Sequence, residues 1–176
     1  MHPSSVTNMK RAMEIVKDYL FTGMTVLDVG GRNIGTPDRS YKHLYDYLFP
    51  KYYVADINEG PNVTHIMKHP YELPFEDDSV DLIVSGQTLE HVRNPFRSVA
   101  EMKRVLKPGG YMILIAPSQG KYHDNPDCWR FMDDAFKSIA AEDEVDLEVI
   151  ADWVDLSAPD ERSQRWKDHT FVGQKR

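Results

Sequence analysis

Met24-Thr25-Val26-Leu27-Asp28-Val29-Gly30-Gly31 is the stretch that decides the fold class of this 176-residue chain. It is a short apolar run that ends in an acidic residue and two glycines. This pattern is typical of a buried strand that enters a tight turn. We therefore expect the first strand over residues 24–29.

Segments with helical or strand-like spacing follow one another on both sides of this stretch. Helices are predicted over residues 5–20, 40–48, 95–106 and 133–141, with Ser4 or Ser5 available to cap the first of them. Strands are predicted over residues 24–29, 52–57, 62–67, 80–85, 111–116, 147–154 and 170–173. Because the connections are too long for hairpins, the alternation favours a parallel sheet covered by helices on both faces.

The last two predicted strands differ from the others. Residues 147–154 and 170–173 are joined by a polar segment without helical spacing, so we expect them to form an antiparallel pair. The predicted fold is α/β, with a doubly wound, mostly parallel seven-stranded sheet and an antiparallel last strand. At this length the whole chain, residues 1–176, is expected to form one domain.

Composition excludes several classes of partner. The chain has 21 Lys and Arg against 28 Asp and Glu, and a net charge of -7 would repel a nucleic acid backbone. It has neither an apolar run long enough for a membrane helix nor a secretory signal in residues 1–17. Cys128 is the single cysteine, so no internal disulfide can form. We expect a cytoplasmic protein; its oligomeric state is not indicated.

Polar residues and glycines end the first two predicted strands. Asp28, Gly30, Gly31 and Gly35 follow the first strand, and the glycines allow positive φ and close approach of the backbone to a ligand. Asp56 ends the second strand, where a carboxylate can accept hydrogen bonds from both hydroxyls of a ribose. Each feature alone is also typical of an ordinary turn or helix cap. Together they indicate a nucleoside-binding site.

Three further segments complete an ordered set of motifs. They are Leu73-Pro74-Phe75-Glu76-Asp77-Asp78-Ser79-Val80-Asp81-Leu82-Ile83-Val84, Leu89-Glu90-His91-Val92 and Leu106-Lys107-Pro108-Gly109-Gly110. With the stretch from Val26 to Gly30, this set resembles the class I S-adenosylmethionine-dependent methyltransferases, in particular methyltransferase type 11. The resemblance runs from about Val26 to Pro117 and implies that residues 1–176 form a single methyltransferase domain with S-adenosylmethionine as cofactor.

The resemblance also implies which residues hold the cofactor. Asp28, Gly30 and Gly31 would form the first motif, Asp56 with the adjacent Ile57 would hold the ribose, and Leu73 would pack beside the adenine. Ser85, Gly86 and Gln87 would flank the methionine portion. Two residues depart from the family pattern. Arg32 stands where a second glycine is common, which re-spaces the turn, and His69 stands where an acidic residue usually contacts the adenine amino group.

A loop predicted to lie over the carboxyl edge of the sheet carries the candidate acceptor-binding residues. The segment from Gly120 to Phe131 mixes a base, carboxylates, a cation and aromatic rings. Its part from Pro126 to Phe131 is similar to a stretch in methyltransferases of sugar- and polysaccharide-modifying systems, which favours a small molecule or a sugar-bearing precursor as acceptor. His123 is the candidate general base. The candidate substrate contacts are Tyr122, Asp124, Trp129 and Arg130.

Several of these residues also have purely structural interpretations. Trp129 and Phe131 commonly pack in a core or a lid, and Arg130 commonly pairs with a nearby carboxylate. His91 is expected to open the helix that follows and to support the pocket. The remaining histidines show no metal-like spacing with one another or with Cys128, so no metal site is predicted.

Two alternative functions share parts of this pattern. A nicotinamide-dependent oxidoreductase would have the same alternating sheet, but the first motif lacks a clean Gly-x-Gly-x-x-Gly. A catalytically degenerate methyltransferase fold that acts as a binding or scaffold module would explain Arg32 and His69. Binding of S-adenosylmethionine in preference to NADH would exclude the oxidoreductase. Turnover would distinguish an active methyltransferase from the scaffold module.

Overall fold

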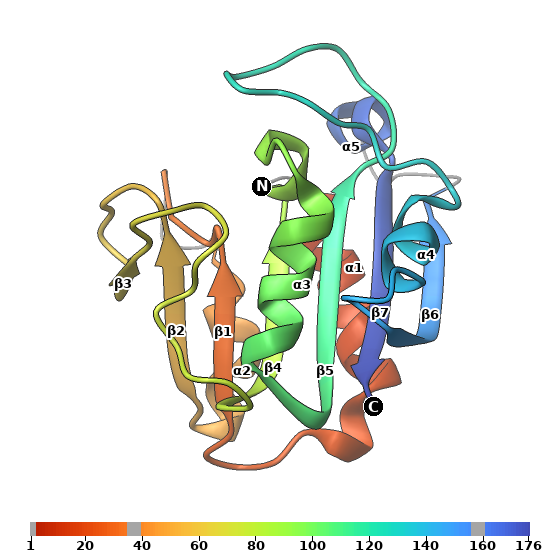
Figure 1. Cartoon of the computed structure of the whole chain (residues 1–176). Coiled ribbons are helices and arrows are strands. Elements are labelled where there is room, and N and C mark those ends of the chain that lie inside the picture. The colour runs from red at the N-terminus through yellow and green to blue at the C-terminus, as the bar shows by residue number, and fades with distance from the viewer. Residues whose placement is uncertain (1–2, 35–39, 156–160) are drawn as a thin grey trace.

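The computed structural model describes residues 3–34, 40–155 and 161–176 (Figure 1). These residues form a seven-stranded sheet in the order β3-β2-β1-β4-β5-β7-β6. Its strands are β1 (Thr25–Val29), β2 (Lys51–Asp56), β3 (His65–Ile66), β4 (Val80–Gly86), β5 (Leu106–Pro117), β6 (Leu147–Val154) and β7 (Asp168–Lys175). The first five strands run parallel, whereas β7 is antiparallel to both of its neighbours. The predicted fold class is therefore confirmed.

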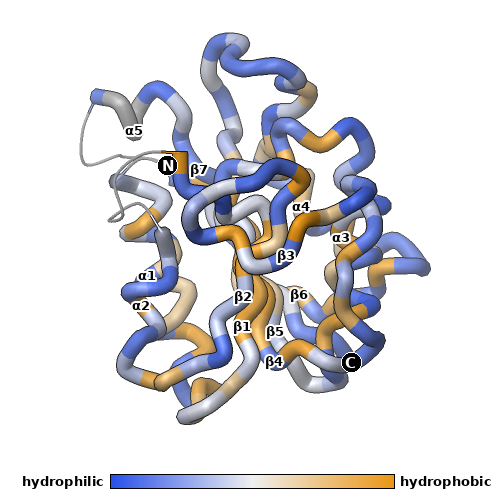
Figure 2. Tube along the Cα trace, turned by 90° about the vertical axis from the view of Figure 1, so that its left-hand side faces the viewer, coloured by the Kyte–Doolittle hydropathy of each residue, from blue (hydrophilic) through white to orange (hydrophobic). Residues whose placement is uncertain are grey.

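Helices cover both faces of the sheet. They are α1 (Pro3–Ile15), α2 (Lys42–Tyr45), α3 (Pro95–Val105), α4 (Ala135–Ala140) and α5 (Glu161–Trp166). Figure 2 shows the sheet edge-on, with α1 and α2 on one side, α3 and α4 on the other, and hydrophobic residues concentrated on the central strands. No helix in these three described ranges is both long and apolar enough to span a membrane.

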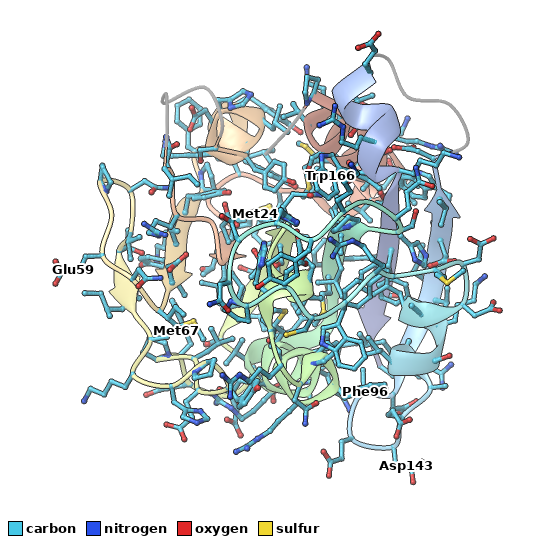
Figure 3. The ribbon with its side chains drawn as sticks, turned by 90° about the horizontal axis from the view of Figure 1, so that it is seen from above. Met24, Glu59, Met67, Phe96, Asp143 and Trp166 are labelled. Atoms are coloured by element: carbon cyan, nitrogen blue, oxygen red, sulfur yellow. The ribbon has the colours of Figure 1, made fainter. Side chains whose placement is uncertain are left out.

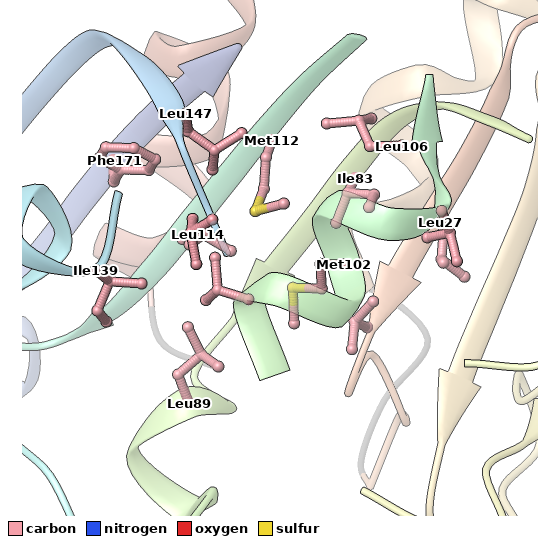
Figure 4. Close-up of a cluster of buried hydrophobic side chains, with 14 of the residues drawn as sticks. Leu27, Ile83, Leu89, Met102, Leu106, Met112, Leu114, Ile139, Leu147 and Phe171 are labelled. Carbon is pink, nitrogen blue, oxygen red and sulfur yellow. The ribbon is translucent and has the colours of Figure 1, made fainter. Parts of the chain in front are cut away.

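Two hydrophobic clusters, one on each face, fix the helices to the sheet. On the α3 face, Met102 packs among Leu27, Ile83 and Leu114 from three neighbouring strands (Figure 4). The α3 helix begins at Pro95, after Asn94, whose side-chain oxygen caps it by accepting a hydrogen bond from the amide of residue 97. Burial of β4 on both faces explains the apolar run Leu82-Ile83-Val84 at its centre.

The boundaries of some predicted elements were wrong. Ser4 and Ser5 do not cap α1 from outside; they lie within the helix, and their hydroxyls bind the side chains of Asp168 and Tyr41. The strand predicted over residues 62–67 is reduced to β3. The amide of Thr64 donates to the carbonyl of Val54 in β2, but the amide of Val54 donates to the Thr64 hydroxyl and not to a backbone carbonyl.

The segment between β6 and β7 also differs from the prediction. A polar loop without a helix was expected there, but α5 precedes β7. The six residues of α5 are too few and too polar to show a clear helical period in the sequence. The helix ends at Trp166, and this ring packs on His123 with the ring centroids 4.6 Å apart.

Candidate active site

The carboxyl ends of the parallel strands surround a cavity of about 810 Å³. Its walls come from the turn after β1, the end of β2, the segment after β4 and the loop after β5. Figure 3 looks down on this edge and labels Met67 and Trp166, which both line the cavity. In open α/β sheets this edge is where ligands bind. The segments that the sequence analysis selected therefore meet at one place.

The turn after β1 depends on its two glycines. Gly30 has a φ of 75°, a conformation that favours glycine, and its amide donates to the carbonyl of Ala55 (2.8 Å). A Cβ atom on Gly31 would lie 2.2 Å from the carboxyl carbon of Asp28. Glycine is therefore needed at residue 31 because the carboxylate of Asp28 lies directly against its backbone. Gly35, which was expected to share in this turn, lies outside the described residues.

Asp28 is a buried carboxyl group at the floor of the cavity. The Tyr52 hydroxyl donates to its Oδ2 atom (2.9 Å), and its Oδ1 atom has no hydrogen-bond partner among the described residues. Burial, with a smaller contribution from the nearby charge of Asp56, raises the pKa of Asp28 to about 7 against the opposing effect of the Tyr52 hydrogen bond. This group can therefore change protonation state near neutral pH.

Asp56 lines the cavity from the end of β2, next to the turn of β1. Its Oδ1 atom accepts a hydrogen bond from the amide of Asn58 (2.8 Å) and lies 3.7 Å from Nε of Arg32. Ile57 also lines the cavity and is 57% exposed. Arg32, the departure from the family pattern in the first motif, is thus placed beside the candidate ribose-binding carboxylate.

Three residues considered for the cofactor do not line the cavity. Leu73 is buried in the α3-side cluster, and its amide donates to Glu101. Ser85 is buried, and its hydroxyl donates to the carbonyl of Val29 (2.8 Å). His69 is exposed on the surface. Their direct roles stay predictions.

Gly86 and Gln87 line the cavity at the end of β4. A Cβ atom on Gly86 would lie 2.0 Å from the Tyr41 hydroxyl oxygen, so this position also needs glycine. Gln87 has a φ of 58°, and its side-chain amide donates to Asp168 (2.9 Å). Burial raises the pKa of Asp168 to about 6, against hydrogen bonds from Ser4 and Gln87 that lower it.

The loop after β5 brings His123 and Asp124 to the opposite wall. His123 Nδ1 lies 3.3 Å from Asp127 Oδ2, and the side chain of Asp127 is almost fully buried. Arg130 donates to both oxygens of Asp127 and to the carbonyl of Lys121. This bidentate pair holds the pKa of Asp127 well below its usual range. Arg130 therefore anchors the loop and does not line the cavity.

Other residues of this loop also point elsewhere. Tyr122 is 69% exposed and lies outside the cavity lining. The indole of Trp129 donates to the carbonyl of Val92 (2.8 Å), which fastens the loop to the segment before α3. Of the candidate acceptor-side residues, His123 and Asp124 line the cavity, whereas Tyr122, Trp129 and Arg130 do not.

Sequence reasoning missed Glu90 as a cavity residue. Leu89–His91 forms a short 3-10 turn after β4, separate from α3, so His91 does not open that helix as predicted. The Glu90 side chain is fully buried, and burial raises its pKa to about 8. Its position beside His91 was visible in the sequence, but only the fold shows that both groups reach the same cavity as His123.

The doubly wound sheet and the cavity at its carboxyl edge are the arrangement in which open α/β sheets bind their ligands. Residues 45–114 match the family model described as a methyltransferase domain. An uncharacterized methyltransferase from Mycobacterium avium is 52% identical over 107 residues, covering 52% of this chain and 39% of the relative. The chain thus spans well under half the length of such curated relatives.

Solved structures show the same fold. A Burkholderia thailandensis 1,6-didemethyltoxoflavin N1-methyltransferase, with its substrate and S-adenosylhomocysteine bound, has a TM-score of 0.69 at 14% identity, covering 98% of this chain and 80% of that one. A putative methyltransferase in complex with the Trm112 activator of Haloferax volcanii has a TM-score of 0.65 at 19% identity, covering 98% and 94%. Over residues 45–114 the chain is thus similar to the methyltransferase domain family, and its fold is that of these solved methyltransferase structures.

Proposed function

We propose that this chain transfers a methyl group from S-adenosylmethionine to a small-molecule or sugar-bearing acceptor. The observation that carries the proposal is the position of Asp56, which lines the same cavity as the Gly30 turn from the neighbouring strand. A carboxylate at this position can accept hydrogen bonds from both hydroxyls of a ribose.

The described residues fit this cofactor in size and chemistry. The cavity, at about 810 Å³, is within the range of small-molecule sites, roughly 300–1,000 Å³. Asp56 would hold the ribose, and the backbone around Gly30 and Gly31 would lie against the methionine portion together with Gly86 and Gln87. The partnerless Oδ1 atom of Asp28 offers a further acceptor beneath this turn.

The chemistry places modest demands on the protein. Bound S-adenosylmethionine supplies a methyl group that is already activated on a positively charged sulfur. The residues of this chain therefore mainly have to align the acceptor with that methyl group. His123, held through Nδ1 beside Asp127, is the candidate base for removing a proton from an acceptor hydroxyl. Asp124 lines the same wall and is the candidate residue for binding the acceptor.

The acceptor class is inferred from charge and from the loop after β5. A net charge of -7 opposes binding of a nucleic acid. A solved structure of the same fold holds a small molecule beside S-adenosylhomocysteine, which supports a small acceptor here as well. The similarity of residues 126–131 to sugar-modifying methyltransferases supports a sugar-bearing precursor.

Calorimetric titration tests the cofactor assignment without turnover. We expect the chain to bind S-adenosylmethionine and S-adenosylhomocysteine but not NADH. Asp56→Ala should weaken both affinities by about 100-fold, because two charge-assisted hydrogen bonds are lost. Asp46→Ala is the matched control, because Asp46 is an exposed carboxylate outside the cavity. This variant should bind both ligands with the affinity of the parent.

The remaining outcomes separate the alternatives. Binding of NADH alone would replace the methyltransferase proposal by an oxidoreductase. Binding of neither cofactor would contradict the enzyme and favour a scaffold role. Cofactor binding should be followed by release of S-adenosylhomocysteine in a screen of hydroxyl-bearing small molecules and sugar conjugates, and tight binding with no turnover on any acceptor would also favour the scaffold.

A further inference from the structure

The wall opposite Asp56 brings together Glu90, His91 and His123. Glu90 and His91 come from the 3-10 turn after β4, and His123 comes from the loop after β5. One potential ligand atom from each of the three residues lies within 4.8 Å of the other two. All three residues line the cavity. The cluster therefore faces the space in which the acceptor would be held.

The carboxyl group of Glu90 lacks the hydrogen-bond partners that a buried polar group normally has. The side chain has no exposed surface, and neither oxygen has a hydrogen-bond partner among the described residues. Arg130, the cation of the adjoining loop, has its guanidinium committed to Asp127 and to backbone carbonyls. Buried polar groups are normally paired or bound to a metal, because an unpaired one is costly. Glu90 thus indicates a ligand that supplies positive charge.

The hydrogen bonds of the two imidazoles leave their other nitrogens available. His91 Nδ1 lies 2.6 Å from the carbonyl oxygen of Pro126, which only accepts, so Nδ1 carries the hydrogen. Its Nε2 atom then presents a lone pair and lies 3.7 Å from Glu90 Oε1. A backbone carbonyl on the far nitrogen is the usual support of a metal-binding histidine.

The same assignment holds for His123. Its Nδ1 atom lies near Asp127 Oδ2 (3.3 Å) and near Nη2 of Arg130 (3.5 Å). Both hydrogens of that guanidinium nitrogen already serve Asp127 and the carbonyl of Lys121 at 2.7 Å each. We therefore assign the hydrogen of this imidazole to Nδ1, which faces the Asp127 carboxylate, so that Nε2 keeps its lone pair. A carboxylate behind an imidazole is again the arrangement found behind metal ligands.

We propose that Glu90, His91 and His123 bind a divalent transition-metal ion of the zinc type on the acceptor side of the cavity. Two imidazole nitrogens and one carboxylate oxygen are a donor set that such ions take while keeping an open position for water or substrate. Ligands about 2.1 Å from a tetrahedral ion lie about 3.4 Å apart. The separations between the three ligand atoms, which are at most 4.8 Å, therefore have to shorten by up to about 1.4 Å around the ion.

The open position defines the class of acceptor, and this step rests on the proposed function. An acceptor hydroxyl bound to the ion loses its proton to water, which leaves an oxygen with a free electron pair. That oxygen forms a bond to the methyl carbon while the carbon–sulfur bond breaks, and the electron pair of the broken bond neutralises the sulfur. His123 then serves as a ligand in place of a general base.

Metal titration of the untagged full chain, stripped of metal beforehand, tests the site directly. Zn²⁺ should bind at one equivalent by calorimetry, and Co²⁺ should give the visible absorption of a tetrahedral site. We expect Glu90→Gln and His123→Ala each to weaken Zn²⁺ binding at least 10-fold. His43→Ala, an exposed histidine outside the cavity, is the control and should bind as the parent does.

Thermal unfolding and cofactor titration are the two controls for the metal-binding measurement. Glu90→Gln replaces the buried carboxyl group by an amide of the same shape, so thermal unfolding should show a folded protein. Absence of stoichiometric binding, or equal binding by Glu90→Gln and the parent, overturns the metal site and leaves His123 as the candidate base. Titration of the same metal-free samples with S-adenosylhomocysteine tests the proposed function separately, since cofactor binding does not require these three residues.

Discussion

On the β1–β2 side of the cavity, Asp28 and Asp56 each accept a hydrogen bond from this chain, whereas on the opposite side neither oxygen of Glu90 has a partner among the described residues. The first side is built from the ends of adjacent parallel strands, with Asp28 paired to Val54 in register. The second is assembled from a 3-10 turn and a loop about 30 residues further along the chain.

The two sides of the cavity therefore differ in what holds their ligand-facing residues in place. The backbone of the strand ends fixes the side with Asp28 and Asp56, the proposed cofactor side, so its geometry follows directly from the fold. The side with Glu90, the proposed acceptor side, depends on side-chain contacts such as the Asp127–Arg130 pair and the hydrogen bond from Trp129 to Val92. A substitution on one side of the cavity should therefore alter the stability and ligand binding of that side more than those of the other side.

The largest expected effect comes from removing the anchor of the acceptor loop. Arg130→Ala leaves the buried carboxylate of Asp127 uncompensated, at a cost of roughly 3 kcal/mol. The amides of Cys128 and Phe131, which donate to Glu90 and Pro117, should lose about 100-fold of their protection against hydrogen exchange. The affinity for S-adenosylhomocysteine should change less than about 3-fold if the two sides are independent.

Lys121→Ala is the matched control for this change, since Lys121 is an exposed cation on the same loop. It should leave the protection of both amides unaltered. Because the pKa of Asp127 is held low, the difference between the parent and Arg130→Ala should also shrink as acid protonates this carboxylate. Equal loss of protection in the control would show that the ion pair does not hold the loop.

The second effect concerns the cofactor side and its pH dependence. The pKa of Asp28 is raised from 3.8 to about 7, so folded protein binds more protons than unfolded protein between these values. The contribution of Asp28 protonation to the free energy of unfolding is fully present below pH 3.8 and is lost as the pH rises through 7. Between pH 5 and pH 8 the parent should lose roughly 2.5 kcal/mol more stability than Asp28→Asn.

Urea unfolding at several pH values measures this difference. Asp143→Asn, an exposed carboxyl group far from the cavity, should follow the parent curve (Figure 3). Parallel curves for the parent and Asp28→Asn would mean that Asp28 is ionised at both pH values. That result would contradict a raised pKa of Asp28 in the folded protein.

The contrast between the two sides also explains what the sequence could predict. The grouping of Asp28, Gly30 and Asp56 at one edge of the sheet could be predicted because strand ends are visible as apolar runs, and parallel strands bring their ends to one edge. Glu90 was missed because nothing in Leu-Glu-His-Val shows that a fully buried side chain will face a cavity. Arg130 was a candidate substrate contact, but the other interpretation, an ion pair with a nearby carboxylate, agrees with its contacts to Asp127. Side-chain pairing in loops depends on folded geometry that spacing does not encode.

The smallest effect tests whether the departure at residue 32 weakens the cofactor side. Arg32 and Asp56 form a partly exposed pair with 3.7 Å between Nε and Oδ1, and such pairs contribute about 0–1 kcal/mol. Arg32→Ala frees the carboxylate for the ribose, so the affinity for S-adenosylhomocysteine should rise by up to about 5-fold. Arg93→Ala, another cavity-lining arginine without an ion pair to Asp56, serves as control and should change little. A weaker affinity in Arg32→Ala alone would instead make Arg32 a cofactor contact, in which case the re-spaced glycine turn adds a positive charge to the cofactor site.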